Sequence, residues 1–200
     1  MRLLIATTNP HKLREIRAIL AGLEVAIDGL DAVAPVPEPE EQGRTFEENA
    51  RAKAAYYADA TGETVVAEDS GLEIDALDGA PGVYSARFGL PGAVTFPDKF
   101  ALIYRALRER SRERSPARFV CALALAAPGQ LLFETRASVE GTIADEPRGA
   151  GGFGYDPILY YPPLGRTLAE LTADEKAAVS HRGKAFRALR AFLMASFNGT

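Results

Sequence analysis

Carboxylate side chains gather in one short stretch of this sequence, directly after an apolar run. The cluster consists of Glu68, Asp69, Glu73, Asp75 and Asp78. Carboxylates at the carboxyl end of a buried strand are well placed to hold Mg²⁺, which takes one or two carboxylates together with waters and substrate phosphates. Asp69 is the strongest candidate because the residues before it, Val65–Ala67, are apolar. Glu73 and Asp75 alternate with Leu72 and Ile74, so we expect these two acids on a solvated strand face.

A second group of polar side chains follows the first apolar run, where a strand leads into a helix. It comprises Thr7, Thr8, Asn9, Pro10, His11 and Lys12. Asn9 is a favoured N-cap residue and proline is favoured in the first helical turn. The free N–H groups of such a helix start, with two hydroxyls and an ammonium, suit phosphate oxygens. A well-capped surface helix with a solvated lysine explains the same residues, and the segment lacks the glycines of a Walker loop.

The segment from Thr45 to about Ala60 predicts a helix with acidic residues in its first turn. Thr45 and Glu48 form a capping pattern, and the segment is rich in alanine. Asn49 and Lys53 lie four residues apart and share a helix face, whereas Glu48 and Lys53 lie about 140° apart at the α-helical pitch. The helix dipole favours acids at this end with or without a bound metal, so a purely structural role stays open.

Glycines and aromatic residues combine in residues 150–157, AGGFGYDP. Gly154 and its neighbouring glycines let the backbone approach a ligand, while Phe153 and Tyr155 offer faces that could stack on a nucleobase. Asp156 could accept a hydrogen bond from a ring N–H. A tight turn with its aromatic side chains in the core explains the segment equally well.

Hydrogen-bond donors converge near the C-terminal helix. Lys176 lies towards the end of one short predicted helix, and Ser180, His181 and Arg182 lie at the start of the next. Taken alone, His181 is more typical of a solvated first-turn residue. Cys121, within an apolar strand, is expected to be a packed core thiol.

Strands and helices alternate along most of the chain. Short apolar runs predict strands at 2–7, 23–27, 64–69 and 72–75, and helical spacing predicts helices at 10–20, 45–60, around 100–107 and at 180–195. Two long apolar segments, 117–128 and 131–143, predict a hairpin, and residues 34–43, 78–93 and 108–115 predict loops or turns. Because the hairpin breaks strict alternation, we expect an α/β fold with a mixed β-sheet and flanking helices.

Composition excludes several classes of protein. The 200 residues are 47% hydrophobic and 25% charged, which is ordinary for a globular domain and excludes collagen-like, disordered and coiled-coil chains. A single cysteine allows neither an internal disulfide nor a multi-cysteine zinc site. No apolar run is long enough to span a bilayer, and the N-terminus is too short and polar for a signal peptide, so we expect a cytoplasmic protein. The net charge of −4 argues against nucleic acid as the main partner.

Taken together and in this order, the segments resemble the inosine/xanthosine triphosphate pyrophosphatase family. The resemblance covers nearly the whole chain, through TTNPHK, TFEENARAKA, AEDSGLEIDALDGAPGVYSARF, GGFGYDP and LTADEKAAVSHRGKAF. It implies a single domain over residues 1–200, with two lobes and the active site in the cleft between them. It also implies a homodimer, dependence on Mg²⁺, and cleavage of non-canonical purine nucleoside triphosphates such as ITP, dITP and XTP to monophosphate and pyrophosphate.

The resemblance also implies roles for individual residues. Glu48, Asp69 and Glu68 would bind the metal, and Asp69 would also be the catalytic base. The nucleotide would be bound by Thr7, Thr8, Asn9, Pro10, His11, Lys12, Lys53, Ser70, Phe153, Gly154, Tyr155, Asp156, Lys176, His181 and Arg182. Two positions depart from the family pattern, since Thr8 replaces a common glycine and Glu68 a common aspartate.

Two functions remain open from the sequence. In the first, water attacks the α-phosphorus, Asp69 orients or deprotonates that water, and nearby cations offset the charge of the leaving pyrophosphate. Donors from Arg182, His181 or backbone N–H groups would then favour a 6-oxo purine and disfavour a 2-amino group. In the second, the chain is a sensor that binds purine triphosphates without turnover, although clustered acids are of little use to such a pocket.

Overall fold

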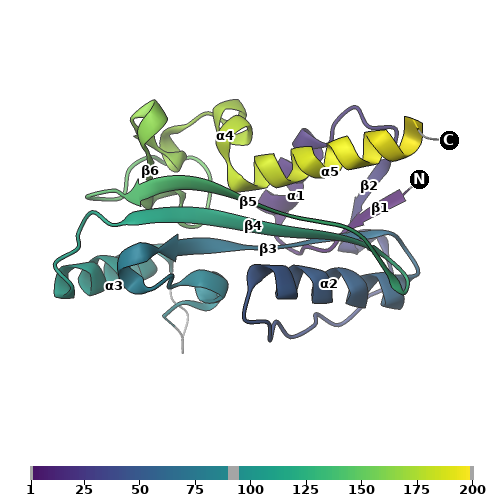
Figure 1. The fold of residues 1–200 in the computed structure, drawn as a ribbon, viewed down its shortest axis with the longest axis horizontal. Coiled ribbons are helices and arrows are strands. Elements are labelled where there is room, and N and C mark those ends of the chain that lie inside the picture. The colour runs from purple at the N-terminus through teal and green to yellow at the C-terminus, as the bar shows by residue number, and fades with distance from the viewer. Residues whose placement is uncertain (1, 90–94, 199–200) are drawn as a thin grey trace. The chain divides into compact units, whose positions relative to one another are not determined.

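A mixed β-sheet with helices on its faces forms the centre of the fold in this computed structural model, which describes residues 2–89 and 95–198 (Figure 1). Within those ranges, seven strands form one sheet in the order β2-β1-β3-β4-β5-β6-β7. The strands are β1 Arg2–Ile5, β2 Ala26–Gly29, β3 Val65–Ile74, β4 Pro116–Ala127, β5 Gln130–Ile143, β6 Leu159–Tyr161 and β7 Arg166–Thr167. β1 pairs parallel with β2 and β3, whereas β6 pairs antiparallel with β5 and β7. The predicted fold class is therefore confirmed; the expected cleft between two lobes stays a prediction.

The helices agree with the predicted segments, with one extension. They are α1 Pro10–Ile19, α2 Phe46–Thr61, α3 Phe96–Glu109, α4 Ala173–Val179 and α5 His181–Asn198. α3 begins earlier than the apolar pattern indicates because Thr95 and Asp98 form a capping box. It also runs two residues into the segment expected to be a charged turn, since buried Leu107 extends its apolar stripe. The turn is correspondingly shorter.

The prediction of two separate strands around the acid cluster is wrong, because β3 runs unbroken from Val65 to Ile74. Gly71 does not break the strand. A Cβ atom at Gly71 would lie 2.3 Å from Ser85 Oγ and 2.6 Å from the Gly82 carbonyl oxygen. The glycine is there because a 3₁₀ turn, Gly82–Arg87, passes directly over it. Residues 90–93, the end of the predicted loop 78–93, lie outside the described residues.

The chain divides into two compact units. Unit 1 contains Met1–Asp69, Cys121–Ala137 and His181–Thr200, and unit 2 contains Ser70–Val120 and Ser138–Ser180. In unit 1, α1 and α5 cover one face of the strands and α2 the other (Figure 1). The core of the α1/α5 face includes Ile16, Val66, Cys121, Phe186 and Leu189. Cys121 is thus a buried core residue, as predicted.

Unit 2 has its own core, built on α3 and the adjoining ends of β3 to β5. Phe100, Ile103 and Leu107 of α3 pack with strand residues such as Leu72 and Phe119. Each such side chain contributes roughly 1.5–3 kcal/mol by leaving water. In the described parts of the chain, no helix is long and apolar enough to cross a membrane.

Candidate functional site

Asp69 lies at the middle of β3, on the face of the sheet that α2 covers. The side-chain amide of Asn49 donates a hydrogen bond to Asp69 Oδ2 over 2.8 Å, and both residues are buried. Burial raises the pKa of Asp69 above its usual value, although the bond from Asn49 opposes that rise. A carboxylate held by one amide, with a raised pKa, is suited to accept a proton near neutral pH.

The segment around Glu41 adds an acid that sequence analysis missed. Glu41 forms an ion pair with Lys53 of α2, and its negative charge further raises the pKa of Asp69. The same segment is fixed to α2 because the Gly43 N–H donates to Asn49 Oδ1 over 2.8 Å. Asn49 therefore holds both Asp69 and the Glu41 segment. No sequence pattern distinguishes Glu41 from the other acids of its proline-rich loop. The one available signal was indirect: Asn49 and Lys53, which contact the Glu41 segment, are spaced so that they share a helix face.

Glu48, predicted as a metal ligand, lies in the first turn of α2 and is exposed. Its Oε2 atom accepts a hydrogen bond from the Arg44 N–H over 2.7 Å, while Thr45 caps the helix by accepting from the Glu48 N–H. These contacts are those of a helix start. Glu48 thus has a structural role at the start of α2.

Glu68 points to the opposite face of the sheet from Asp69, because successive side chains of a strand alternate. It meets Arg182 of α5 in a forked ion pair, with Nη2 of Arg182 2.9 Å and Nε 3.0 Å from the carboxylate. Lys12 Nζ lies 3.1 Å from Glu68 Oε1. Burial alone would raise the pKa of Glu68, but the charges of Arg182 and Lys12 hold it well below its usual value.

Side chains of the segment itself accept hydrogen bonds from backbone N–H groups at the start of α1. Asn9 is the N-cap, and its Oδ1 atom accepts from the N–H groups of His11 and Lys12 at 2.9 and 3.3 Å. The Asn9 N–H donates to Thr7 Oγ1. An anion at this helix start would compete with the Asn9 side chain for these donors. The Lys12 ammonium and the Thr7 and Thr8 hydroxyls are the additional groups that the segment brings there.

In unit 2, Asp156 and Lys176 form a buried ion pair with 2.7 Å between Oδ2 and Nζ. Asp156 Oδ2 also accepts the Phe153 N–H at 2.7 Å, which closes the glycine-rich turn. The Lys176 ammonium lies 4.7 Å from the centre of the Phe153 ring. The structure thus brings Phe153, Asp156 and Lys176 together, and Phe153 is partly exposed.

The Tyr155 ring is buried, whereas a ring that stacks on a nucleobase needs an accessible face. Its ring is buried in the unit 2 core against Phe96 and Phe100, and its hydroxyl donates to the Ser85 carbonyl over 2.9 Å. Gly154 has a φ of +67°, a conformation that favours glycine, so it shapes the turn. The side chain of Tyr155 therefore anchors the glycine-rich turn to the core of unit 2.

Other predicted residues have these positions. Ser70 follows Asp69 on β3 and is half-buried, His181 is buried at the start of α5, and His11 and Pro10 are exposed on α1. Glu73 is half-buried and Asp75 is exposed, as expected for a solvated face, and Arg118 of the neighbouring β4 lies 3.4 and 2.9 Å from them. Their partner comes from a distant part of the chain.

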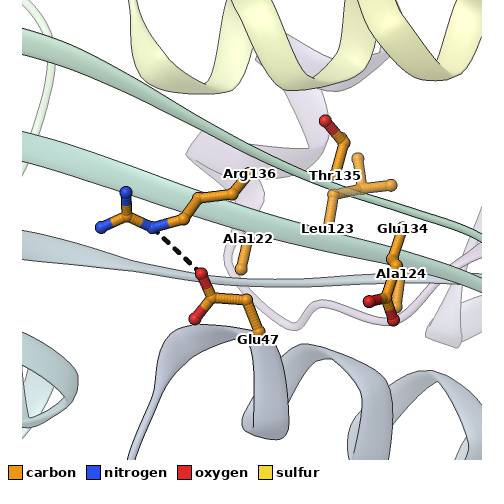
Figure 2. Close-up of a pocket in the computed structure, with 7 residues that line it drawn as sticks. All are labelled: Glu47, Ala122, Leu123, Ala124, Glu134, Thr135 and Arg136. Atoms are coloured by element: carbon orange, nitrogen blue, oxygen red, sulfur yellow. Dashed lines mark ion pairs between the residues drawn. The ribbon is translucent and has the colours of Figure 1, made fainter.

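Unit 1 also contains a hollow of about 250 Å³ beside the start of α2. Figure 2 shows Glu47 and Arg136 pointing towards one another across it, with 3.0 Å between Glu47 Oε1 and Arg136 Nε. Ala122, Leu123, Ala124, Glu134 and Thr135 complete its lining. No residue in this lining is among the predicted site residues, and its opposite charges are already paired.

A buried carboxylate with a raised pKa, next to an acid and a lysine, is typical of an enzyme site rather than of a solvated surface. The fold and these residues define an α/β enzyme. The chain belongs to the Ham1 family, whose pattern matches residues 3–192. It is 47% identical over 199 residues to a dITP/XTP pyrophosphatase of an Exiguobacterium species, with 100% of each chain covered.

Two further relatives support the same conclusion. A dITP/XTP pyrophosphatase of Thermus thermophilus is 48% identical over 189 residues, covering 94% of this chain and 90% of the relative. The solved structure of a HAM1 protein from Coxiella burnetii is 40% identical, with a TM-score of 0.90 over 98% of this chain and 99% of that one. The resemblance inferred from the sequence motifs is therefore confirmed.

Proposed function

We propose that this chain hydrolyses non-canonical purine nucleoside triphosphates, such as dITP, ITP and XTP, to the monophosphate and pyrophosphate. The observation that carries the proposal is the buried Asp69 carboxylate, held by Asn49 beside Glu41 and Lys53. The names of relatives matched over 94% to 100% of this chain supply the substrate class.

The residues around Asp69 fit a magnesium ion shared with the substrate. Two acids, Asp69 and Glu41, lie close enough for their charges to interact, and carboxylate oxygens are ligands that Mg²⁺ prefers. Among the described residues, no three His, Cys, Asp or Glu side chains form a closed metal cage. Such a site suits an ion that completes its coordination with waters and phosphates. Asp69 and Glu41 would hold it, with Glu48 and Glu68 as the alternatives, and it would supply positive charge beside the phosphates.

The reaction step rests on Asp69. Water attacks the α-phosphorus, the bond to the bridging oxygen breaks, and pyrophosphate leaves. Asp69 orients that water and accepts its proton, while the Lys12 and Lys53 ammonium groups bind the phosphate chain and offset the charge that develops on the leaving oxygens. Thr7 and Thr8 add hydroxyl donors beside Lys12.

The purine would be recognised by unit 2. Phe153 offers a partly exposed ring, and the paired Asp156 and Lys176 fix the turn that presents it. Ser70 and His181 stay as predicted nucleotide contacts. We also propose that the enzyme acts in the cytoplasm as a homodimer, which size-exclusion chromatography with light scattering would test.

The decisive experiment incubates purified protein and Mg²⁺ with a panel of ITP, dITP, XTP, ATP and GTP, and identifies the products. Pyrophosphate from the first three is the expected result. Orthophosphate would indicate an ordinary phosphatase, and binding without product would favour a nucleotide sensor. Hydrolysis of GTP as fast as ITP would contradict selection against the 2-amino group.

The role of Asp69 has its own test. Asp69→Asn keeps the size of the side chain and removes the proton acceptor, so kcat should fall by a factor of about 10²–10⁴ while the fold survives. Circular dichroism would check the fold, and pyrophosphate release would measure kcat. Turnover close to that of the unchanged protein would assign the base to another group.

A further inference from the structure

Lys99, in the first turn of α3, is a buried cation that the proposed reaction does not use. The residue is only 5% exposed, and within residues 2–89 and 95–198 no acid forms an ion pair with it. Burial lowers the pKa of Lys99, because nothing offsets the lost hydration of its charge. A cation near a helix N-terminus also opposes the helix dipole. This placement costs free energy, so the contacts of the ammonium are the feature to explain.

The Lys99 ammonium joins α3 to the 3₁₀ turn Gly82–Arg87. Its Nζ atom donates a hydrogen bond to the Ala86 carbonyl oxygen over 2.5 Å and lies 4.9 Å from the centre of the Phe96 ring. A cation over an aromatic face is attracted by the ring, and more strongly where water is excluded. Lys99 therefore fixes the Phe96 ring relative to the 3₁₀ turn.

The Phe96 ring lies in turn against the glycine-rich turn that contains Gly154. Its centre is 5.3 Å from that of the Tyr155 ring and the two planes are 88° apart, which is a favourable edge-to-face contact. A Cβ atom at Gly154 would lie 3.7 Å from Phe96 Cζ, so the ring edge is close to the turn backbone. The Tyr155 hydroxyl donates to the Ser85 carbonyl, in the 3₁₀ turn that Lys99 also binds.

On the proposed function, this glycine-rich turn presents the partly exposed Phe153 ring to the purine. We propose that Lys99 and Phe96 are positioning residues for the purine: the ammonium fixes the Phe96 ring, and that ring holds the turn in the conformation that presents Phe153. Neither residue contacts the substrate. A turn that is already ordered loses less conformational entropy when the purine binds. The phosphate contacts and the chemical step do not depend on this arrangement.

The test compares two products of the proposed reaction, inosine monophosphate and inorganic pyrophosphate, with binding measured by calorimetry. Lys99→Met keeps the apolar stem and removes the ammonium. It should weaken binding of the monophosphate by about tenfold and change binding of pyrophosphate by less than about twofold. KM for ITP should rise by a similar factor of about ten while kcat stays nearly constant, because the lost interaction serves substrate and transition state alike.

Amide hydrogen exchange tests the positioning without any ligand. Lys99→Met should speed exchange in residues 150–157 by about tenfold and leave exchange in α2 unchanged. Phe96→Leu removes the ring from an exposed position, and it should give the same effects even if Lys99→Met does not fold. The double variant Phe96→Leu/Lys99→Met should weaken monophosphate binding by less than about twofold beyond either single variant, because both act through one ring.

Arg110→Met is the matched control. Arg110 lies at the other end of α3 and also donates to a backbone carbonyl, that of Ala76. Its loss should leave monophosphate binding, KM for ITP and exchange in residues 150–157 unchanged.

Several results would overturn the inference. They are equal weakening of monophosphate and pyrophosphate binding by Lys99→Met, unchanged exchange in residues 150–157, and effects that multiply in the double variant. The same effects in Arg110→Met would also contradict it. The proposed function fails separately, if the unchanged protein releases no pyrophosphate from any nucleotide. The hydrogen-exchange comparison does not depend on that outcome.

Discussion

Asp156 and Lys176 are predicted nucleotide contacts, but their buried ion pair also stabilises the fold. Their side chains are 4% and 7% exposed, so Lys176→Met would leave a carboxylate buried without its cation. We expect this variant to lower the free energy of unfolding by about 3–5 kcal/mol. Asp156→Asn/Lys176→Met should recover most of that loss. Urea unfolding at pH 7 measures both, and a single-variant cost below about 1 kcal/mol would show that the pair behaves like an exposed one.

The residue types indicate a candidate chemistry for the site, whereas its contacts between distant residues cannot be predicted from them. Asp69 is the strongest candidate in the sequence because an apolar run precedes it, and the structure places it in a buried position where the Asn49 amide donates a hydrogen bond to it. Glu68 is adjacent to Asp69 and is also a predicted metal ligand, yet strand alternation places its side chain on the other face of the sheet. Its partner Arg182 lies 114 residues along the chain, and no local pattern can predict that pairing.

At the scale of elements, the close contact between β3 and the 3₁₀ turn Gly82–Arg87 is a specific point of vulnerability. In Gly71→Ala the new methyl would overlap Ser85 Oγ, which also accepts the Leu72 N–H at 2.9 Å. Overpacking and loss of that bond should together cost about 3 kcal/mol or more.

A matched control is Gly62→Ala, at the C-cap of α2. Its φ is +72° but no atom lies within 4 Å of the added Cβ, so only backbone strain of about 1 kcal/mol is expected. Thermal and urea unfolding would compare the two variants. An equal loss of unfolding free energy in the two variants would mean that the 3₁₀ turn Gly82–Arg87 shifts readily to make room for a methyl group at position 71.

Element types were predictable because apolar spacing is local, whereas their ends depended on side-chain contacts. The Thr95/Asp98 capping box makes α3 begin earlier than its apolar pattern predicts. β3 continues through Gly71, where a glycine in the sequence predicts the end of a strand. The position of Tyr155 stays open in the sequence for a related reason. An aromatic residue in a glycine-rich turn is equally suited to stacking and to burial, and only the packing of Phe96 and Phe100 decides between them.

At the scale of the whole molecule, carboxylates paired with arginines determine how the protein responds to acid. The pKa of Glu68 is held below its usual value, and so are the pKa values of Glu134, Asp145 and Glu175 beside their arginines. In each case the unfolded chain takes up a proton at a higher pH than the folded protein. Their stabilisation is therefore present above about pH 4.5 and lost as the pH falls further.

Glu68 should dominate this response because it is buried, whereas the other three pairs are exposed and screened by solvent and salt. The free energy of unfolding should fall between about pH 5 and pH 3, by up to about 1.4 kcal/mol per pH unit for Glu68. Asp69 acts in the opposite sense, since its raised pKa makes its contribution greatest in acid. Urea unfolding at pH 7, 5, 4 and 3 would measure the slope. The double variant Glu68→Gln/Arg182→Gln should reduce this slope of unfolding free energy against pH, whereas 0.5 M salt should leave most of the slope in place. An unchanged slope in the double variant would assign the acid response to the exposed pairs.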